Sequence, residues 1–152
     1  MAKSRILVVG YEQKTSRTIC WVLEYKGHKA RPASGPEAAI EALIEKNYDL
    51  VIAEFGNGSG DNLRVLRRAK QLNPRTRIIL MNDNQSPLFP LEAYCLEVDD
   101  YLLMPISPTE LWRRVSRCLE PAPDLRLGET TEDRFISLTR RGDNFAQEIP
   151  VG

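Results

Sequence analysis

The chain has 152 residues, and its 21 basic and 21 acidic side chains give a formal net charge of zero. This length suits one ordinary domain with a buried core, and the balanced charge excludes a global attraction to nucleic acid or to membrane surfaces. The first apolar run, residues 6–9, is too short for a signal-peptide core or a membrane span, and Cys20, Cys95 and Cys118 lack metal-ligand spacing. We therefore expect a cytoplasmic location with no membrane contact.

Apolar runs alternate regularly with helical patterns along the chain. The runs predict strands at residues 6–9, 29–33, 49–55, 77–81 and 101–103. Helical spacing and capping patterns predict helices at residues 18–26, from Gly35-Pro36-Glu37 onward, at 62–72, from Ser86-Pro87 or Pro90, and from Ser107-Pro108-Thr109-Glu110. Gly27 stands where the first helix needs a left-handed C-cap.

This alternation predicts a parallel sheet with helices on both faces. Pro32 cannot donate a hydrogen bond to a neighbouring strand, so the second strand is expected at an edge. An edge position favours strand order 2-1-3-4-5, the flavodoxin-like, doubly wound arrangement of five strand–helix units. In such a sheet the ligand crevice lies at the carboxyl ends of strands one and three, where residues 10–12 and Glu54 would face each other.

The composition changes after residue 120. Residues 121–124 have a stiff, proline-containing linker composition, and the rest of the tail is polar with scattered apolar residues. We expect residues 4–120 to form the domain and residues 121–152 to form a linker and tail. The tail is expected either to be disordered or to dock on a partner through residues 135–138. Because the tail shows no helix-turn-helix pattern, we expect no direct nucleic-acid binding.

Four motifs in order resemble the receiver domain of bacterial response regulators over residues 4–120. They are Ile6-Leu7-Val8-Val9 with the polar triplet that follows, DLVIAEF, IILMN and DDYLLMPIS. The resemblance implies a CheY-like fold in which a histidine kinase phosphorylates an aspartate that ends the third strand. It also implies Mg²⁺ held by acidic side chains, a lysine that pairs with the phosphoryl group, and a hydroxyl that senses it.

The carboxylates of this chemistry are altered here. Gly10 and Tyr11 replace the acidic pair, and Glu12 is what remains of the triplet. Glu54 occupies the acceptor position, where its extra methylene moves the carboxylate by roughly 1.5 Å, a displacement that can cost around a hundredfold in rate. We therefore expect no metal cofactor, although weak Mg²⁺ binding through Glu12 and Glu54 stays open.

The remaining positions are altered as well, except one. Asn82 replaces the hydroxyl, and Met104 replaces the lysine, which removes a contact worth roughly 1.5–3 kcal/mol. Tyr101 keeps the switch aromatic. One hypothesis is that Glu54 mimics a phosphoryl charge, that Asn82 bonds to it, and that Tyr101 is thereby held in one rotamer. The other is that these are ordinary polar residues in a drifted pocket.

The favoured interpretation is a pseudo-receiver, a signalling module without enzymatic activity or cofactor. Its expected partners are proteins, such as a histidine kinase or another signalling protein. The resemblance also implies that the chain can form a homodimer through helix four, strand five and helix five, for which Arg113, Arg114 and Arg117 are candidate salt-bridge residues. One alternative is a working phosphorelay receiver that uses Glu54.

A second alternative is a flavodoxin-like cofactor binder, in which Thr15, Ser16 and Thr18 would be phosphate ligands, although the glycine spacing of a dinucleotide loop is missing. His28 is expected to face solvent. The basic stripe of the third helix is expected to be solvated as well; it comprises Arg64, Arg67, Arg68 and Lys70.

Overall fold

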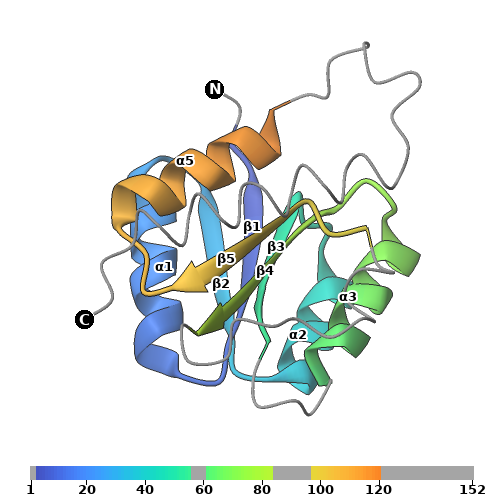
Figure 1. Cartoon of the computed structure of the whole chain (residues 1–152). Helices are drawn as coiled ribbons and strands as arrows, with labels where there is room; N and C mark the ends of the chain where they lie inside the picture. Colours follow the sequence, from blue (N-terminus) through green and yellow to red (C-terminus); the bar gives the residue numbers. More distant parts are fainter. Residues whose placement is uncertain (1–2, 56–60, 84–96, 121–152) are drawn as a thin grey trace.

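The computed structural model of the chain describes residues 3–55, 61–83 and 97–120. Strands and helices alternate through these ranges (Figure 1). The elements are β1 (Arg5–Val9), α1 (Gln13–Tyr25), β2 (Lys29–Ala33), α2 (Pro36–Glu45), β3 (Leu50–Glu54), α3 (Asp61–Leu72), β4 (Arg77–Asp83), β5 (Asp100–Met104) and α5 (Pro108–Leu119). The helix expected to start at residue 86 or 90, and the tail 121–152, lie outside the described residues.

The strands form one parallel sheet in the order β2-β1-β3-β4-β5. Figure 1 shows α1 and α5 on one face of this sheet and α2 and α3 on the other. The predicted fold class and strand order are therefore confirmed. Pro32 lies on the edge strand β2, opposite Val8 of β1. Proline has no N–H to donate to a neighbouring strand, and an edge strand tolerates this loss because it has a neighbour on one side.

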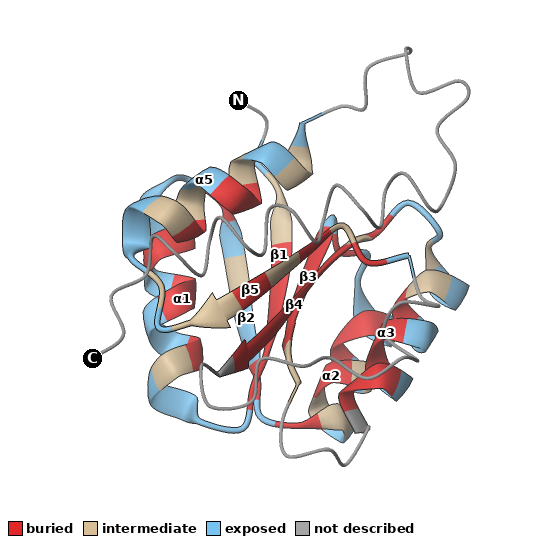
Figure 2. Cartoon of the chain, viewed as in Figure 1, coloured by how far each residue is buried: buried red, intermediate tan, exposed pale blue. Residues whose placement is uncertain are grey.

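The core has two layers because both faces of the sheet are covered. In β1, Leu7 and Val9 pack toward α2 and α3, whereas Ile6 and Val8 pack toward α1 and α5. Residues of opposite orientation are thus both removed from water, which explains why the strand is continuously apolar rather than alternating. In Figure 2 the inner strands are largely buried, while β2 carries exposed residues.

The capping predictions agree with the structure. Gly27 has φ 95°, a left-handed conformation that glycine adopts without strain. Ser107 caps α5 because its hydroxyl accepts a hydrogen bond from the Glu110 amide at 3.1 Å. Helix α1 begins at Gln13 rather than Thr18, so its first polar turn lies directly beside the loop after β1.

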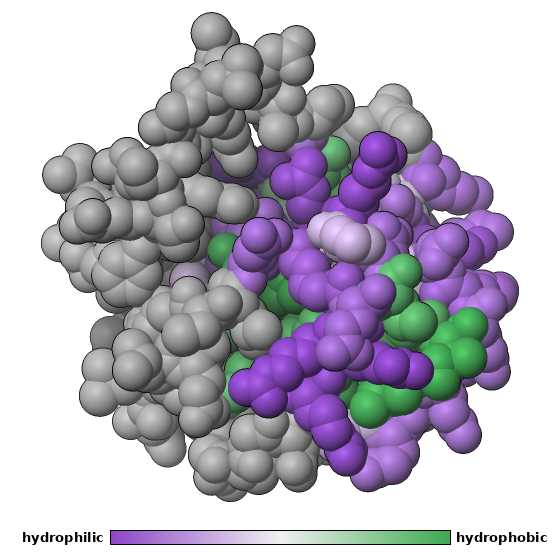
Figure 3. All heavy atoms as spheres, turned by 90° about the vertical axis from the view of Figure 1, so that its right-hand side faces the viewer, coloured by the Kyte–Doolittle hydropathy of each residue, from purple (hydrophilic) through white to green (hydrophobic). Residues whose placement is uncertain are grey.

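The outer face of α2 and α3 is mainly hydrophilic, with hydrophobic residues gathered in part of the view (Figure 3). Ile44 of α2 is 62% exposed, because the buried stripe of this helix is formed by Ala39, Ala42 and Leu43. In the basic stripe, Arg64 pairs with Glu37 at 3.2 Å. Arg67 and Arg68 are exposed as predicted, but Lys70 is half-buried and lies 3.8 Å from Glu97.

The expectation that His28 faces solvent was wrong. Its ring is buried, with a centroid 5.2 Å from that of Trp112. Nδ1 accepts a hydrogen bond from the Ser4 amide at 3.1 Å, which makes Nε2 the protonated nitrogen of the neutral ring. Within the described part of the chain, Nε2 has no hydrogen-bond partner. Burial lowers the pKa of His28, and the nearby charge of Asp49 opposes this shift.

We predict that the domain loses stability as the pH falls below the ordinary histidine pKa of 6.5. The folded state favours neutral His28, so its contribution is fully present above 6.5 and declines as the pH falls toward the lower folded-state pKa. Urea midpoints measured about one pH unit above and below 6.5 test this. Since this is the single histidine of the chain, His28→Gln should flatten the dependence; identical pH profiles of the two proteins would contradict the prediction.

No helix within the described ranges is long and apolar enough to cross a membrane.

Candidate functional site

The carboxyl ends of β1 and β3 meet at one edge of the sheet. Val9 of β1 lies opposite Ala53 of β3, so the residues that follow, Gly10 and Glu54, are brought together. Glu54 is half-buried at the last position of β3 and lies opposite Met81 of β4. The two segments that the sequence placed at the crevice therefore do lie side by side.

The carboxylate of Glu54 is held by the backbone of the loop after β1. Its Oε2 accepts a hydrogen bond from the Tyr11 amide at 3.2 Å. The same loop is fixed on its other side, because the Gly10 amide donates to the Ala33 carbonyl at 3.1 Å. A carboxylate accepting from a backbone N–H is a charge-assisted contact. The side chain at the acceptor position thus ties two chain segments together.

Gly10 is packed too closely to carry a side chain in this arrangement. A methyl group on its Cα would lie 2.5 Å from Ser16 Oγ and 3.2 Å from Glu54 Oε2. Ser16 is buried on α1, so a larger residue at position 10 requires its hydroxyl to move and the Glu54 carboxylate to give way slightly as well. The sequence indicated that an acidic residue is missing at position 10. It did not indicate that Ser16 and Glu54 occupy the space that such a side chain would need.

The residues of the crevice do not fit the magnesium site that the family likeness implies. Gly10 offers no carboxylate and no room for one, and Tyr11 is exposed with a neutral side chain. Glu12 is exposed at the N-cap of α1, and one oxygen of Glu54 is bonded to the Tyr11 amide. Across the described part of the chain, no cluster of three or more potential metal ligands from His, Cys, Asp and Glu occurs.

Sequence reasoning missed Asn62, at the start of α3. Its side chain is buried, and Nδ2 donates to the backbone carbonyl of Glu54. The following residue of the β3 segment is also fixed, since the Phe55 amide donates to the Met81 carbonyl at 2.6 Å. The sequence feature that could have indicated its role is a polar residue at the start of a helix, next to the expected crevice. Asn62 and Met81 thus fix the backbone that presents Glu54.

The predicted switch residues lie on β4 and β5. Asn82 is buried and lies opposite Leu103, and Tyr101 is partly buried against the core layer that contains α2 and α3. Met104 ends β5 and packs against the other layer, which contains α1 and α5. The peptide bond between Met104 and Pro105 is cis. An apolar side chain therefore stands where the family likeness implies a lysine.

Arg114 was expected at a dimer surface, and this was wrong. Its side chain is buried, and its Nε and Nη2 donate to the two carboxylate oxygens of Asp100 at 2.6 and 2.7 Å. Nη2 also donates to the Tyr101 carbonyl at 3.2 Å. Burial alone would lower the pKa of Arg114, but the hydrogen bonds and charge of Asp100 raise it overall. The arginine joins α5 to the strand that carries the switch tyrosine, whereas Arg113 and Arg117 are exposed.

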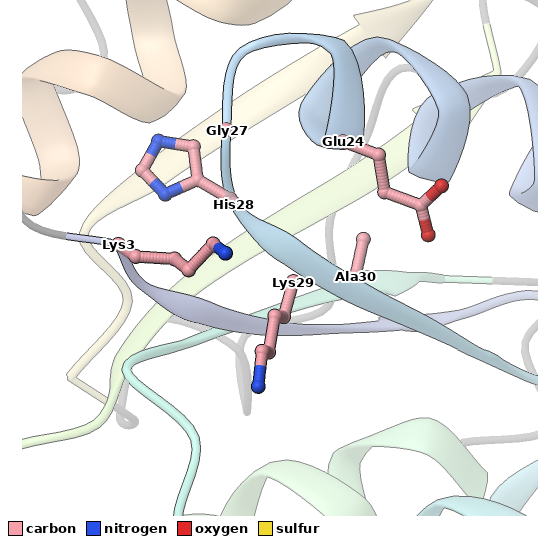
Figure 4. Close-up of a pocket in the computed structure, with 6 residues that line it drawn as sticks. All are labelled: Lys3, Glu24, Gly27, His28, Lys29 and Ala30. Carbon is pink, nitrogen blue, oxygen red and sulfur yellow. The ribbon is translucent and has the colours of Figure 1, made fainter.

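The described residues also form a hollow that adjoins this crevice, since Glu12 and Met104 line it, and another hollow far from it. A cavity of about 380 Å³ between α1 and the segment after β5 has apolar walls that include Ile19, Met104 and Leu111 and a polar rim that includes Glu12 and Lys14. The other, about 400 Å³, lies at the opposite end of the sheet around Lys3, His28 and Lys29. In Figure 4 its side chains point to different sides of β2 and do not converge. We assign the second hollow no binding function.

No family model matches the chain, but curated proteins and solved structures resemble it. It is 26% identical to the uncharacterized transcriptional regulatory protein YkoG of Bacillus subtilis over 99% of this chain and 69% of that protein. It is 28% identical to ResD of the same organism over 79% of this chain and 50% of ResD. The corresponding values for AlgB of Pseudomonas aeruginosa are 28%, 98% and 32%. The chain thus spans about half of ResD and about a third of AlgB.

Solved structures agree in fold. The chain matches NtrX of Brucella abortus with a TM-score of 0.70 and 20% identity, over 99% of this chain and 31% of that one. It matches the chemotaxis response regulator CheY4 of Vibrio cholerae with a TM-score of 0.69 and 17% identity, over 78% of this chain and all of that one, a share of 100%.

The sheet order and the two helical layers define a flavodoxin-like α/β domain of the CheY-like fold. The curated relatives narrow this class. The chain is similar to response-regulator receiver domains of the CheY-like type, both in its curated relatives and in its fold.

The expectation of no nucleic-acid partner is contradicted by these relatives. YkoG, ResD and AlgB are all named as transcriptional regulatory proteins. The zero net charge and the lack of a helix-turn-helix pattern in the tail are properties of these 152 residues. They do not bear on nucleic-acid binding through another domain or another protein. Regulation of transcription can use a separate domain, and several relatives are much longer than the part that matches. Composition was therefore the wrong evidence from which to exclude nucleic acid.

Proposed function

We propose that this receiver domain signals by binding a protein partner, without conventional aspartyl phosphorylation. The observation that carries the proposal is the hydrogen bond from the Tyr11 amide to the Glu54 carboxylate. Phosphoryl transfer needs a carboxylate that can attack beside cations that neutralise the phosphoryl oxygens. Here the carboxylate at the acceptor position is engaged with the loop, and Gly10 and Met104 stand where the family likeness implies an acid and a lysine.

In this proposal Glu54 serves as a fixed negative charge. Its bond to the Tyr11 amide sets the path of the loop between β1 and α1, and the Tyr11 side chain is exposed at the surface. The affinity of a partner that binds this loop would therefore depend on whether the hydrogen bond to Glu54 is formed. The degenerate pocket of the proposal comprises Gly10, Tyr11, Glu12, Asn82 and Met104, with Tyr101 as the switch aromatic.

The partly buried position of Tyr101 supports the view that the switch is held in one state. Its carbonyl is bonded to Arg114, which is itself fixed by Asp100. We place this domain at residues 4–120 and assign residues 121–152 to a linker and tail. The names of the curated relatives support an output at the level of transcription.

The test is affinity capture of a partner from the source cell, with and without acetyl phosphate and Mg²⁺. We expect wild type to retain the same amount of partner under both conditions. Glu54→Gln should retain roughly fivefold less, because losing a charged acceptor costs about 1 kcal/mol. Glu41→Gln is the matched control, since Glu41 is exposed on α2 away from the crevice.

Retention that changes with acetyl phosphate would instead favour a working phosphorelay receiver. A Glu54→Gln protein that retains its partner as well as Glu41→Gln would show that the crevice does not communicate with the binding surface.

A further inference from the structure

Helix α1 carries a pair of large aromatic side chains on its outer face. Trp21 is 65% exposed and Tyr25 is 77% exposed. Their rings stack at a centroid distance of 5.9 Å with 25° between the planes. Single exposed apolar residues are ordinary, but adjacent tryptophan and tyrosine side chains are the residue types that anchor protein interfaces.

The charges around this pair are unevenly distributed along the helix. The buried face of α1 points to the sheet and comprises Ser16, Ile19, Cys20, Val22 and Leu23. The exposed residues recur at helical spacing on the outer side (Figure 2) and comprise Gln13, Lys14, Arg17, Thr18, Trp21, Glu24 and Tyr25. The stripe is therefore basic before Trp21 and acidic after it.

Arg17 and Glu24 have no ion-pair partner among the described residues. They cannot reach each other readily, since seven residues of α-helix separate their Cα atoms by about 10 Å. Each is thus an exposed charge with no ion-pair partner in the ranges that the structure describes, and each lies about one helical turn or less from an exposed aromatic ring.

We propose that α1 packs against α1 of a second copy of this chain, antiparallel and around a two-fold axis near Trp21. This arrangement places Arg17 of each copy opposite Glu24 and Tyr25 of the other, which satisfies both charges and adds a cation–π contact. A parallel arrangement would place like charges together. The stripe is therefore complementary to itself in the antiparallel sense, and this favours a second copy over an unrelated partner.

The contact is expected to be weak. One helix face buries less area than a standard interface, so the dissociation constant should be on the order of micromolar or weaker. This dimer uses the face of α1, and it goes beyond the proposed function because it does not depend on the state of Glu54.

The test measures the mass of the full chain over a concentration series by analytical ultracentrifugation. We expect a monomer–dimer equilibrium in wild type. Arg17→Glu and Glu24→Arg should each weaken it roughly tenfold, whereas the double variant Arg17→Glu/Glu24→Arg should recover most of the loss. Arg68→Glu, which reverses an exposed charge on α3, is the matched control and should leave the equilibrium unchanged.

Recovery in the double variant separates a contact between copies from general damage to the helix. A chain that stays monomeric at every concentration would overturn the proposal. So would a dimer that both single charge reversals leave intact, because it must then use another face. Trp21→Gln is a second, independent test. It should abolish the dimer, since the Trp21 ring lies at the centre of the proposed interface.

Discussion

Replacing Arg114 with alanine is expected to destabilise the domain by about 3–5 kcal/mol, because it leaves the buried carboxylate of Asp100 without a counter-charge and with the Tyr101 amide as its remaining donor among the described residues. Asp100 and Arg114 are both buried and are joined by two short hydrogen bonds, at 2.6 and 2.7 Å. Arg114 also bonds the Tyr101 carbonyl. A loss of this size is a large part of the stability of an ordinary domain.

Urea denaturation measures the effect, and Arg113→Ala is the matched control. Arg113 is its neighbour on α5, but its side chain is 58% exposed, and its partner Glu110 also pairs with Arg114 at 3.6 Å. That control should cost less than about 1 kcal/mol. The double variant Asp100→Asn/Arg114→Met should be more stable than Arg114→Ala, because it removes both buried charges together. Equal losses for Arg113→Ala and Arg114→Ala would show that the buried pair contributes little.

Much of the fold was predictable because it depends on local patterns. Continuous apolar runs predict strands that are covered on both faces, and Pro32 alone was enough to place β2 at the edge. Gly27 and Ser107 predicted a helix end and a helix start for stereochemical reasons that act within a few residues. The crevice followed from topology, since the ends of β1 and β3 must meet in this strand order.

The contacts that the sequence did not reveal join residues far apart in the chain. His28 was taken for a surface residue because its burial depends on Ser4 and Trp112, which belong to distant elements. Arg114 has the spacing of a surface arginine on α5, and only Asp100 on β5 explains why it is inside. The same holds for the close packing of Gly10 against Ser16 and Glu54.

Restoring the missing residues should make position 54 a much faster phosphoacceptor than it is in the wild type. The variant is Gly10→Asp/Tyr11→Asp/Glu54→Asp/Met104→Lys, which returns the acidic pair, the shorter acceptor and the lysine. With acetyl phosphate and Mg²⁺, we expect a hydroxylamine-labile adduct at least about a hundredfold faster than in wild type, since the attacking carboxylate is repositioned and the cations are returned. Intact-mass measurement before and after hydroxylamine detects it.

The stability losses of these substitutions are not additive, because residues 10 and 54 are in contact. The single and combined variants should therefore be compared. Gly10→Asp alone should cost about 1–3 kcal/mol, because its Cβ meets Ser16 Oγ at 2.5 Å and Glu54 Oε2 at 3.2 Å. Glu54→Asp shortens the side chain that forms the second contact, so the pair should be more stable than the sum of the single losses. Asparagine at position 54 in the restored background is the control without a nucleophile and should give no adduct. An adduct on wild-type Glu54 at the rate of the restored variant would mean that Gly10, Tyr11 and Met104 do not limit the chemistry, and that the hydrogen bond from the Tyr11 amide does not hold the carboxylate back.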